Sequence, residues 1–191
     1  MAEMAIEAGA RILCFQELFN QYWFPTGRDE KAFAAADAVD SPVVEVMRKK
    51  AVEADVAIIL PLFEQEDSRY FNSAVVIDAD GTIKGTYRKL HVPDIPLWEE
   101  KFYFSTGEGN AITNSIFVMT VNRVGSEEAQ DFYGISFCVN PEGELLGGPT
   151  GRQDGILLAD VNLESLGEIR REWPILKERR PDLYGEILMT T

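Results

Sequence analysis

The hydrophobic pattern of the first half alternates between helix spacing and strand spacing. Residues 1–10 carry apolar side chains at helical intervals and end at a glycine, which indicates a short helix. The apolar run RILCF (11–15) predicts a buried strand. A Ser-Pro pair opens residues 41–53, where a serine N-cap, a proline at the first position and spaced apolar residues predict a helix. The run VAIILPLF (56–63) is apolar throughout, which is typical of a strand covered on both faces.

The pattern then changes to two strands around a turn. FNSAVVID (71–78) and TIKGTYRK (82–89) flank the sequence DADG, which predicts a β-hairpin. Residues 88–110 hold two prolines and several aromatic side chains, and we expect a long loop there, of the kind that often carries function.

The second half contains shorter apolar runs. IFVMTVN (116–122) predicts another buried strand, and YGISFCVNP and GILLADVNL follow on either side of a PEGE turn. The tail from residue 163 reads as an amphipathic helix broken at Pro174. Alternating strands and helices, with strands apolar on both faces, predict an α/β fold in which helix layers cover sheets. The length of 191 residues predicts one domain over 1–191.

Charge and composition exclude several classes of protein. The chain has 18 basic and 32 acidic side chains, a formal net charge of −14, which disfavours binding to a nucleic-acid backbone. No apolar run is long enough for a membrane helix, and the first residues lack the pattern of a secretory signal. Two cysteines and one histidine form no disulfide framework or zinc motif, so we expect a cytoplasmic protein without a metal.

Glu17 is the first candidate for chemistry because it follows the RILCF strand directly. A carboxylate at the end of an apolar strand is desolvated, and this raises its pKa toward that of a general base. The alternative is a glutamate that caps a loop amide or pairs with a nearby base.

Two further candidates lie at the ends of the long loop. Lys89, between Arg88 and His91, sits where a strand ends and could present its ammonium to a developing oxyanion, although most lysines are simply solvated. Glu100 lies among aromatic residues, which favours burial, and the alternative is a surface glutamate paired with Lys101 or Arg88.

Other conspicuous side chains fit structural roles better. His91 alone is more often a hydrogen-bonded structural residue than a catalyst. The aromatic group Tyr22, Trp23 and Phe24 is more often packing than a binding site.

The chain resembles the nitrilase (carbon–nitrogen hydrolase) superfamily, in particular its amidase and N-carbamoyl-amine amidohydrolase branches. An ELF after a strand, a YRKLH and an NRVG occur in the family's order, which makes the match specific. The matching segments are residues 9–19, 70–94, 100–109, 114–128, 131–146 and 154–163. The resemblance implies an α-β-β-α sandwich that assembles into homo-oligomers and uses no cofactor.

The resemblance also implies roles for the three candidates. In the family a cysteine attacks an amide or carbamoyl carbonyl, a glutamate takes its proton, a lysine stabilises the oxyanion and a second glutamate assists. By position, Glu17 would be the general base, Lys89 the cation and Glu100 the second glutamate. The substrate would be a small amide or carbamoyl compound, with no nucleic acid or membrane partner.

The chain departs from the family at the nucleophile. The cysteine normally stands in a G-[IV]-x-I-C-[WY] segment between the EKFYF loop and the NSIFV strand, but here residues 105–110 run straight into 111–118. The cysteine-bearing strand, the following helix and the next strand are missing, and the family's first strand is missing as well. The expected fold is therefore an incomplete sandwich.

Neither remaining cysteine is expected to substitute. Alternation along a strand would turn Cys14 to the face opposite Glu17, and Cys138 lies in a segment that matches a different family strand. Cysteines in apolar runs are usually buried, and burial raises the pKa of the thiol, so that little of it is ionised to thiolate.

Three hypotheses remain open for this chain. It is a carbon–nitrogen hydrolase relative that is inactive as it stands, a catalytically dead interaction or oligomerisation module, or a fragment of an intact amidohydrolase. Tail residues Trp173, Ile175, Leu176 and Tyr184 resemble a family segment that builds dimers.

Overall fold

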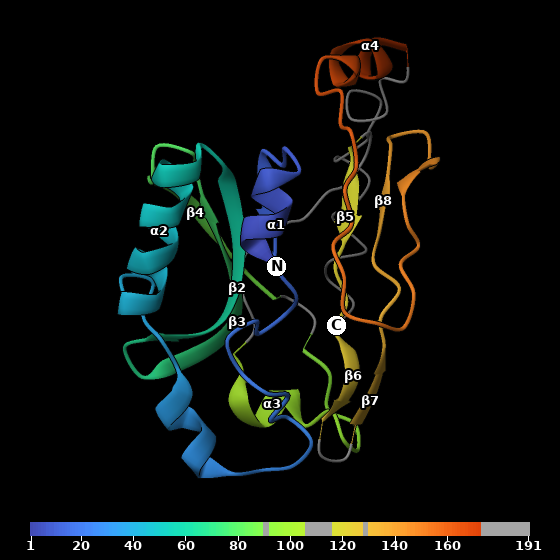
Figure 1. Cartoon of the computed structure of the whole chain (residues 1–191). Coiled ribbons are helices and arrows are strands. Elements are labelled where there is room, and N and C mark those ends of the chain that lie inside the picture. The colour runs from blue at the N-terminus through green and yellow to red at the C-terminus, as the bar shows by residue number, and fades with distance from the viewer. Residues whose placement is uncertain (90–91, 106–115, 128–129, 173–191) are drawn as a thin grey trace, which may run out of the picture.

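The computed structural model describes residues 1–89, 92–105, 116–127 and 130–172. In its first half, a four-stranded sheet is combined with short helices (Figure 1). The elements of this half are α1 (Ala2–Glu7), β1 (Ile12–Cys14), the 3-10 helix η1 (Glu30–Ala35), α2 (Pro42–Ala54), β2 (Ala57–Glu66), β3 (Arg69–Ile77), β4 (Ile83–Arg88) and α3 (Glu100–Tyr103).

Helix α2 forms where local signals predicted it. The hydroxyl of Ser41 accepts a hydrogen bond from the N–H of Val44, and Pro42 occupies the first position. The helix ends at Asp55, whose φ of 53° is left-handed. Val44 and Ala51 are fully buried, so α2 covers one face of the sheet.

The four strands are ordered β1-β2-β3-β4, with β1 parallel to β2 and the other neighbours antiparallel. Alternation separates the two faces of this sheet. Ile58, Leu60 and Leu62 of β2 pack with α2, and we call this the outer face. Phe63 packs into an aromatic cluster on the opposite, inner face, where the long loops lie.

The second half contains two smaller sheets. Strands β5 (Val118–Thr120), β8 (Phe137–Val139) and β9 (Leu145–Gly147) form one of them, in the order β5-β8-β9. Strands β6 (Val124–Glu127) and β7 (Gln130–Tyr133) form a separate hairpin beside α3. Helix α4 (Ser165–Glu172) follows near the end of the described chain.

Most sequence predictions for these elements are confirmed, with local differences. The buried strand expected over 116–122 forms only over β5, and it is not buried, since Val118 and Met119 are exposed. The β6–β7 hairpin was not predicted. The loop expected over 88–110 contains the helix α3, because four residues are too few to show a period. The tail residues Trp173, Ile175, Leu176 and Tyr184 lie outside the described residues.

The structure confirms the predicted α/β class. Figure 1 shows α2 on the outer side of the four-stranded sheet and β5 and β8 on the opposite side of the molecule. Within the described ranges, no helix is long and apolar enough to cross a bilayer.

Candidate active site

Glu17 stands in the loop that leaves the end of β1. The following residue, Leu18, is fully buried and has a left-handed φ of 51°, which turns the chain sharply. The carboxylate oxygen Oε1 of Glu17 accepts hydrogen bonds from Asn72 Nδ2 at 2.5 Å and from Lys89 Nζ at 3.0 Å. The loop thereby places a carboxylate on the inner face of the sheet.

Lys89 follows the last residue of β4 and continues its pairing with β3. Its backbone N–H donates to the carbonyl of Asn72 at 2.8 Å. Its ammonium donates to Glu17 Oε1 and to both oxygens of Glu100, at 3.1 and 2.8 Å. One ammonium therefore holds two carboxylates that come from separate parts of the chain.

Glu100 is the first residue of α3, and its side chain is fully buried. The surrounding cluster is aromatic and includes Trp23, Tyr103 and Phe104. Burial raises the pKa of Glu100 above its ordinary value, and the hydrogen bonds and charge of Lys89 only partly oppose this.

Burial acts on the pKa of Lys89 in the opposite direction from its effect on Glu100, but other contributions reverse the result. Burial alone would lower the pKa of Lys89, but the charges of Glu17 and Glu100 and the hydrogen bonds to them outweigh burial. The net effect raises the pKa of Lys89, so the ammonium stays charged at neutral pH.

These contacts decide between the alternative roles that the sequence analysis left open for the three residues. Lys89 is a half-buried ion-pair partner, not a solvated surface lysine. Glu100 pairs with Lys89 instead of Lys101 or Arg88. Glu17 does pair with a nearby base, as its structural alternative proposed, but that base is the second candidate residue.

The remaining sequence candidates are placed as follows. Trp23 and Phe24 pack within the aromatic cluster, whereas Tyr22 is 80% exposed. His91 lies outside the described residues. Among the residues that the structure describes, no group of three or more His, Cys, Asp and Glu side chains could hold a metal ion.

Cys14 lies on the inner face, contrary to the prediction that it faces away from Glu17. Its neighbour Leu13 packs on the outer face and pairs with Ile58, so Cys14, level with Ile59, must point inward. The prediction was wrong because β1 ends at Cys14, and strand alternation does not extend to Glu17.

Sharing a face does not bring this thiol to the site. Cys14 is level with Val76 of β3, whereas Glu17 binds Asn72, four residues further along β3. Four strand residues span about 14 Å. Cys138 is buried in β8, and burial raises the pKa of both thiols.

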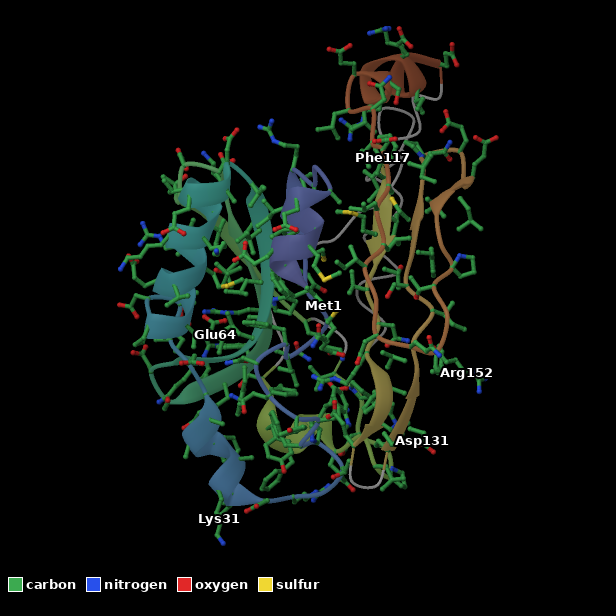
Figure 2. The ribbon with its side chains drawn as sticks, viewed as in Figure 1. Met1, Lys31, Glu64, Phe117, Asp131 and Arg152 are labelled. Atoms are coloured by element: carbon green, nitrogen blue, oxygen red, sulfur yellow. The ribbon has the colours of Figure 1, made fainter. Side chains whose placement is uncertain are left out.

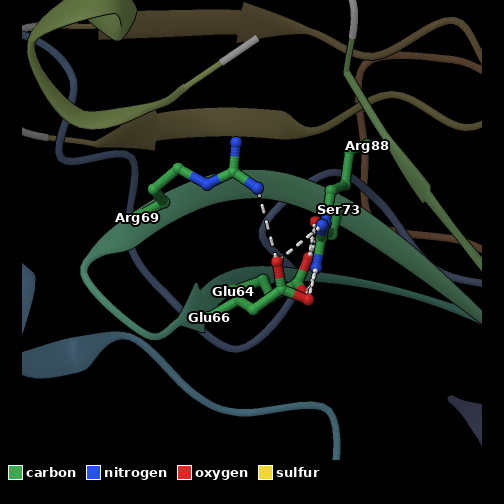
Figure 3. Close-up of polar contacts among 5 residues, drawn as sticks. All are labelled: Glu64, Glu66, Arg69, Ser73 and Arg88. Carbon is green, nitrogen blue, oxygen red and sulfur yellow. Dashed lines mark hydrogen bonds and ion pairs between the residues drawn. The ribbon is translucent and has the colours of Figure 1, made fainter. Parts of the chain in front are cut away.

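The outer face of the same sheet carries a second charged cluster (Figure 3). Glu64, labelled in Figure 2, is fully buried on this side of the sheet. It accepts hydrogen bonds from the hydroxyl of Ser73 and from Arg88. Arg88 also donates to Glu66 at 2.7 and 3.0 Å, and its guanidinium lies 4.1 Å from the ring centroid of Phe71. The adjacent residues Arg88 and Lys89 thus serve opposite faces of the sheet.

Sequence reasoning missed three residues that contact this site. Asn72 binds Glu17 from the middle of β3, inside the quoted FNS sequence. Arg123 donates to backbone carbonyls of the Glu17 loop, and Glu127 binds both Arg123 and that loop. The NRVG sequence, with an acidic residue four positions after its arginine, could have indicated the Arg123–Glu127 pair. The local sequence does not show that this pair binds the Glu17 loop.

Comparison with known proteins gives consistent matches. An N-carbamoylputrescine amidase from Solanum tuberosum is 27% identical over 261 positions, which cover 98% of this chain and 87% of that protein. A citrullinase from Francisella tularensis is 26% identical over 253 positions, covering 96% of this chain and 88% of that one. A crystal structure of a carbon-nitrogen hydrolase from Helicobacter pylori superposes with a TM-score of 0.87 at 25% identity, covering 98% of this chain and 90% of that chain.

These alignments also contain a gap. The alignment with the Solanum tuberosum protein has 261 positions and this chain has 191 residues, so at least 70 positions (261 less 191) have no counterpart here. The structural match confirms the predicted nitrilase-type fold. A family model described as carbon-nitrogen hydrolase matches residues 1–110 and residues 103–171, two segments that overlap over 103–110, next to the junction at which the sequence analysis expects the missing interval. The chain therefore belongs to the carbon-nitrogen hydrolase family.

Proposed function

We propose that Glu17, Lys89 and Glu100 are the acid–base and cationic part of a site that hydrolyses amide or N-carbamoyl bonds of small molecules. The observation that carries the proposal is the ammonium of Lys89 held between two carboxylates, one of them fully buried. We further propose that this chain does not turn over substrate as it stands, because neither of its two cysteines, Cys14 and Cys138, belongs to this site.

Glu17 has the geometry of a proton acceptor. Both of its side-chain hydrogen bonds end on Oε1, and Oε2 has no partner among the described residues. The side chain is 40% exposed, so a substrate could reach it. Oε2 is the atom that we assign to receive a proton from a nucleophile.

Lys89 supplies the positive charge for the oxyanion of a tetrahedral intermediate. Its hydrogen bonds to Glu17 and Glu100 fix the ammonium before substrate arrives, so little reorganisation is needed during the reaction. Glu100 holds the opposite side of the ammonium and keeps it charged.

The missing component is a thiol next to Glu17 Oε2. In the family mechanism the thiolate attacks the carbonyl carbon, ammonia or an amine leaves, and water releases the acyl group from sulfur. Loss of the nucleophile from a catalytic group that acts as a unit lowers the rate by a factor on the order of 10⁶.

The first test is an ammonia-release assay of the purified chain with N-carbamoylputrescine, citrulline and simple aliphatic amides. We expect no release above the buffer background. Turnover that disappears in Cys14→Ala or in Cys138→Ala would contradict the proposed inactivity and identify the thiol responsible.

A second test restores the missing component. The segment that the Solanum tuberosum relative carries in this interval is inserted between Asn110 and Ala111. We expect ammonia release from N-carbamoylputrescine, and losses of roughly 10²–10³-fold in the same chimaera carrying Lys89→Met or Glu17→Gln. A folded chimaera whose turnover is unaffected by both substitutions would overturn the assigned roles.

Lys84→Met is the matched control for the lysine substitution in that chimaera. Lys84 lies on the same strand, β4, and pairs at the surface with Asp78 at 2.9 Å. We expect this variant to retain the activity of the chimaera.

An interaction or oligomerisation module is the second candidate function. Several strand residues leave large apolar side chains exposed, including Val118 and Met119 of β5 and Leu145 of β9. Such surfaces favour association. Light scattering after size exclusion would support this candidate if it gave one defined homo-oligomer, whereas heterogeneous aggregates would favour a fragment of a longer hydrolase.

A further inference from the structure

The guanidinium of Arg123 gathers the loop that carries Glu17. Its Nη2 atom donates to the backbone carbonyls of Glu17 at 2.9 Å, of Leu18 at 3.1 Å and of Gln21 at 3.1 Å. The side chain is only 10% exposed, so few water molecules compete for these carbonyls. Three acceptors of one loop therefore converge on a single buried cation.

Glu127, the last residue of β6, completes this arrangement, four positions after Arg123. Its Oε1 accepts from Arg123 Nη1 at 2.6 Å, and its Oε2 accepts from the backbone N–H of Trp23 at 2.6 Å. Arg123 also lies 5.7 Å from the ring centroid of Phe132. The ion pair thus binds the loop at both ends, with carbonyls bound by the arginine and an amide bound by the glutamate.

The loop needs such a restraint at this point. Leu18 adopts a left-handed φ of 51°, a conformation that a leucine seldom takes without support from its surroundings. The carbonyls on both sides of the Leu18 N–Cα–C unit, those of Glu17 and Leu18, are the ones that Arg123 binds. The direction of the Glu17 side chain depends on this turn.

We infer that Arg123, anchored by Glu127, is the positioning residue for Glu17: it holds the loop in the turn that brings the Glu17 carboxylate to Lys89. Arg123 does not contact the reacting atoms and acts only through the backbone. This inference rests on the proposed role of Glu17 as the general base, and it deepens that role.

The contacts of Arg123 link the two halves of the chain. Arg123 lies 106 residues after Glu17 and beyond the shortened interval, yet its contacts set the geometry of a residue in the first half. The candidate site of the first half is therefore assembled with the help of the β6–β7 hairpin.

The experiment measures the pKa of Lys89 in the full chain by NMR titration of its side-chain amine. The charged groups that contact this amine are Glu17 and Glu100, and the amide of Asn72 donates to the same oxygen of Glu17. We expect Arg123→Met to lower the pKa of Lys89 by about one unit, because a carboxylate that leaves contact no longer stabilises the ammonium. Arg123→Lys should give an intermediate value, since a lysine lacks the fork that reaches several carbonyls.

Two further variants make the result interpretable. Glu17→Gln gives the reference shift for complete loss of the carboxylate. Val44→Ala truncates a fully buried side chain on the outer face and destabilises the protein without touching the loop, so it should leave the pKa of Lys89 unchanged. If Arg123→Met does not fold, Glu127→Gln keeps the arginine, removes its anchor and should shift the pKa in the same direction.

The outcomes separate the two proposals. A shift in Glu17→Gln with none in Arg123→Met or Glu127→Gln would overturn the positioning role and leave the site intact. No shift in Glu17→Gln would remove the Glu17–Lys89 contact on which the proposed function depends. An equal shift in Val44→Ala would show general loosening and would also overturn the positioning role.

Discussion

The two faces of the four-stranded sheet each carry a charged cluster, and the clusters differ in how their charges balance. On the outer face, Glu64 and Glu66 meet Arg69 and Arg88, so two negative charges face two positive charges. On the inner face, the single ammonium of Lys89 serves both Glu17 and Glu100. The inner cluster therefore carries an excess of one negative charge when all three groups are ionised.

The difference extends to the groups that carry the charge. The planar fork of Arg88 reaches both outer carboxylates with several donors, and hydrogen bonds to Glu64 raise the pKa of Arg88 further. On the inner face Glu17 Oε2 is unbonded among the described residues, and the pKa of Glu100 is raised. A saturated cluster suits the support of a fold, whereas an unsaturated one suits proton transfer.

The largest effect is expected on removal of Glu64, the fully buried carboxylate of the outer face. We expect Glu64→Ala to lower the free energy of unfolding by about 3–5 kcal/mol, because Arg88 loses its buried partner. Urea unfolding monitored by circular dichroism measures this loss. A loss below about 1 kcal/mol would contradict the supporting role of the outer cluster.

The next change tests the inner cluster through pH. Lys89→Met leaves Glu100 buried without its cation, so its pKa should rise further above the ordinary value. A carboxyl group whose pKa is raised by folding favours the folded state at low pH, and this contribution is lost as pH rises through the folded pKa. The variant should therefore gain stability on acidification from about pH 8 to about pH 5, relative to the unchanged chain.

The unchanged chain tests the same ion-pair network at high pH. The pKa of Lys89 is raised by folding, so its contribution is present below the unfolded value and is lost as pH rises through the folded value. Urea midpoints should fall above about pH 10.5, and this fall should be reduced in Lys89→Met. Parallel curves for the two proteins would contradict the ion-pair network.

The smallest effect is expected at the exposed ion pair of the outer face. Arg69 contacts Glu66 at 3.6 Å, and both side chains are about half exposed. We expect Arg69→Met to change the free energy of unfolding by less than about 0.5 kcal/mol, because exposed ion pairs contribute little. A loss of free energy approaching that of Glu64→Ala would mean that the stability of the outer cluster depends on the exposed Arg69–Glu66 pair.

The elements predictable from sequence were those with strong local signals. Helix α2 has a serine cap and a proline at its first position, and the β3–β4 hairpin has its DADG turn. Helix α3 lacks such signals because it is only four residues long. The β6–β7 hairpin was missed because its strands are short and mostly polar.

The site was predictable only in part, for a related reason. Glu17, Lys89 and Glu100 each follow or open an element that the resemblance marks, so sequence could nominate them. The contacts of Asn72 and Arg123 span 55 and 106 residues, and no local pattern encodes such a partner. The prediction that Cys14 and Glu17 lie on opposite faces was wrong because β1 ends at Cys14, so strand alternation does not set the path of the residues that follow.

A bulge in the pairing of β3 with β4 restricts the number of residues that their hairpin can contain. Val76 pairs with Gly85, but Ile77 pairs with Ile83, so Lys84 is an extra residue between the turn and the end of β4. Adding or deleting one residue there without a compensating bulge would exchange the sides on which the guanidinium and the ammonium emerge. Natural variation in this hairpin should therefore preserve odd or even length more strictly than it preserves side-chain identity.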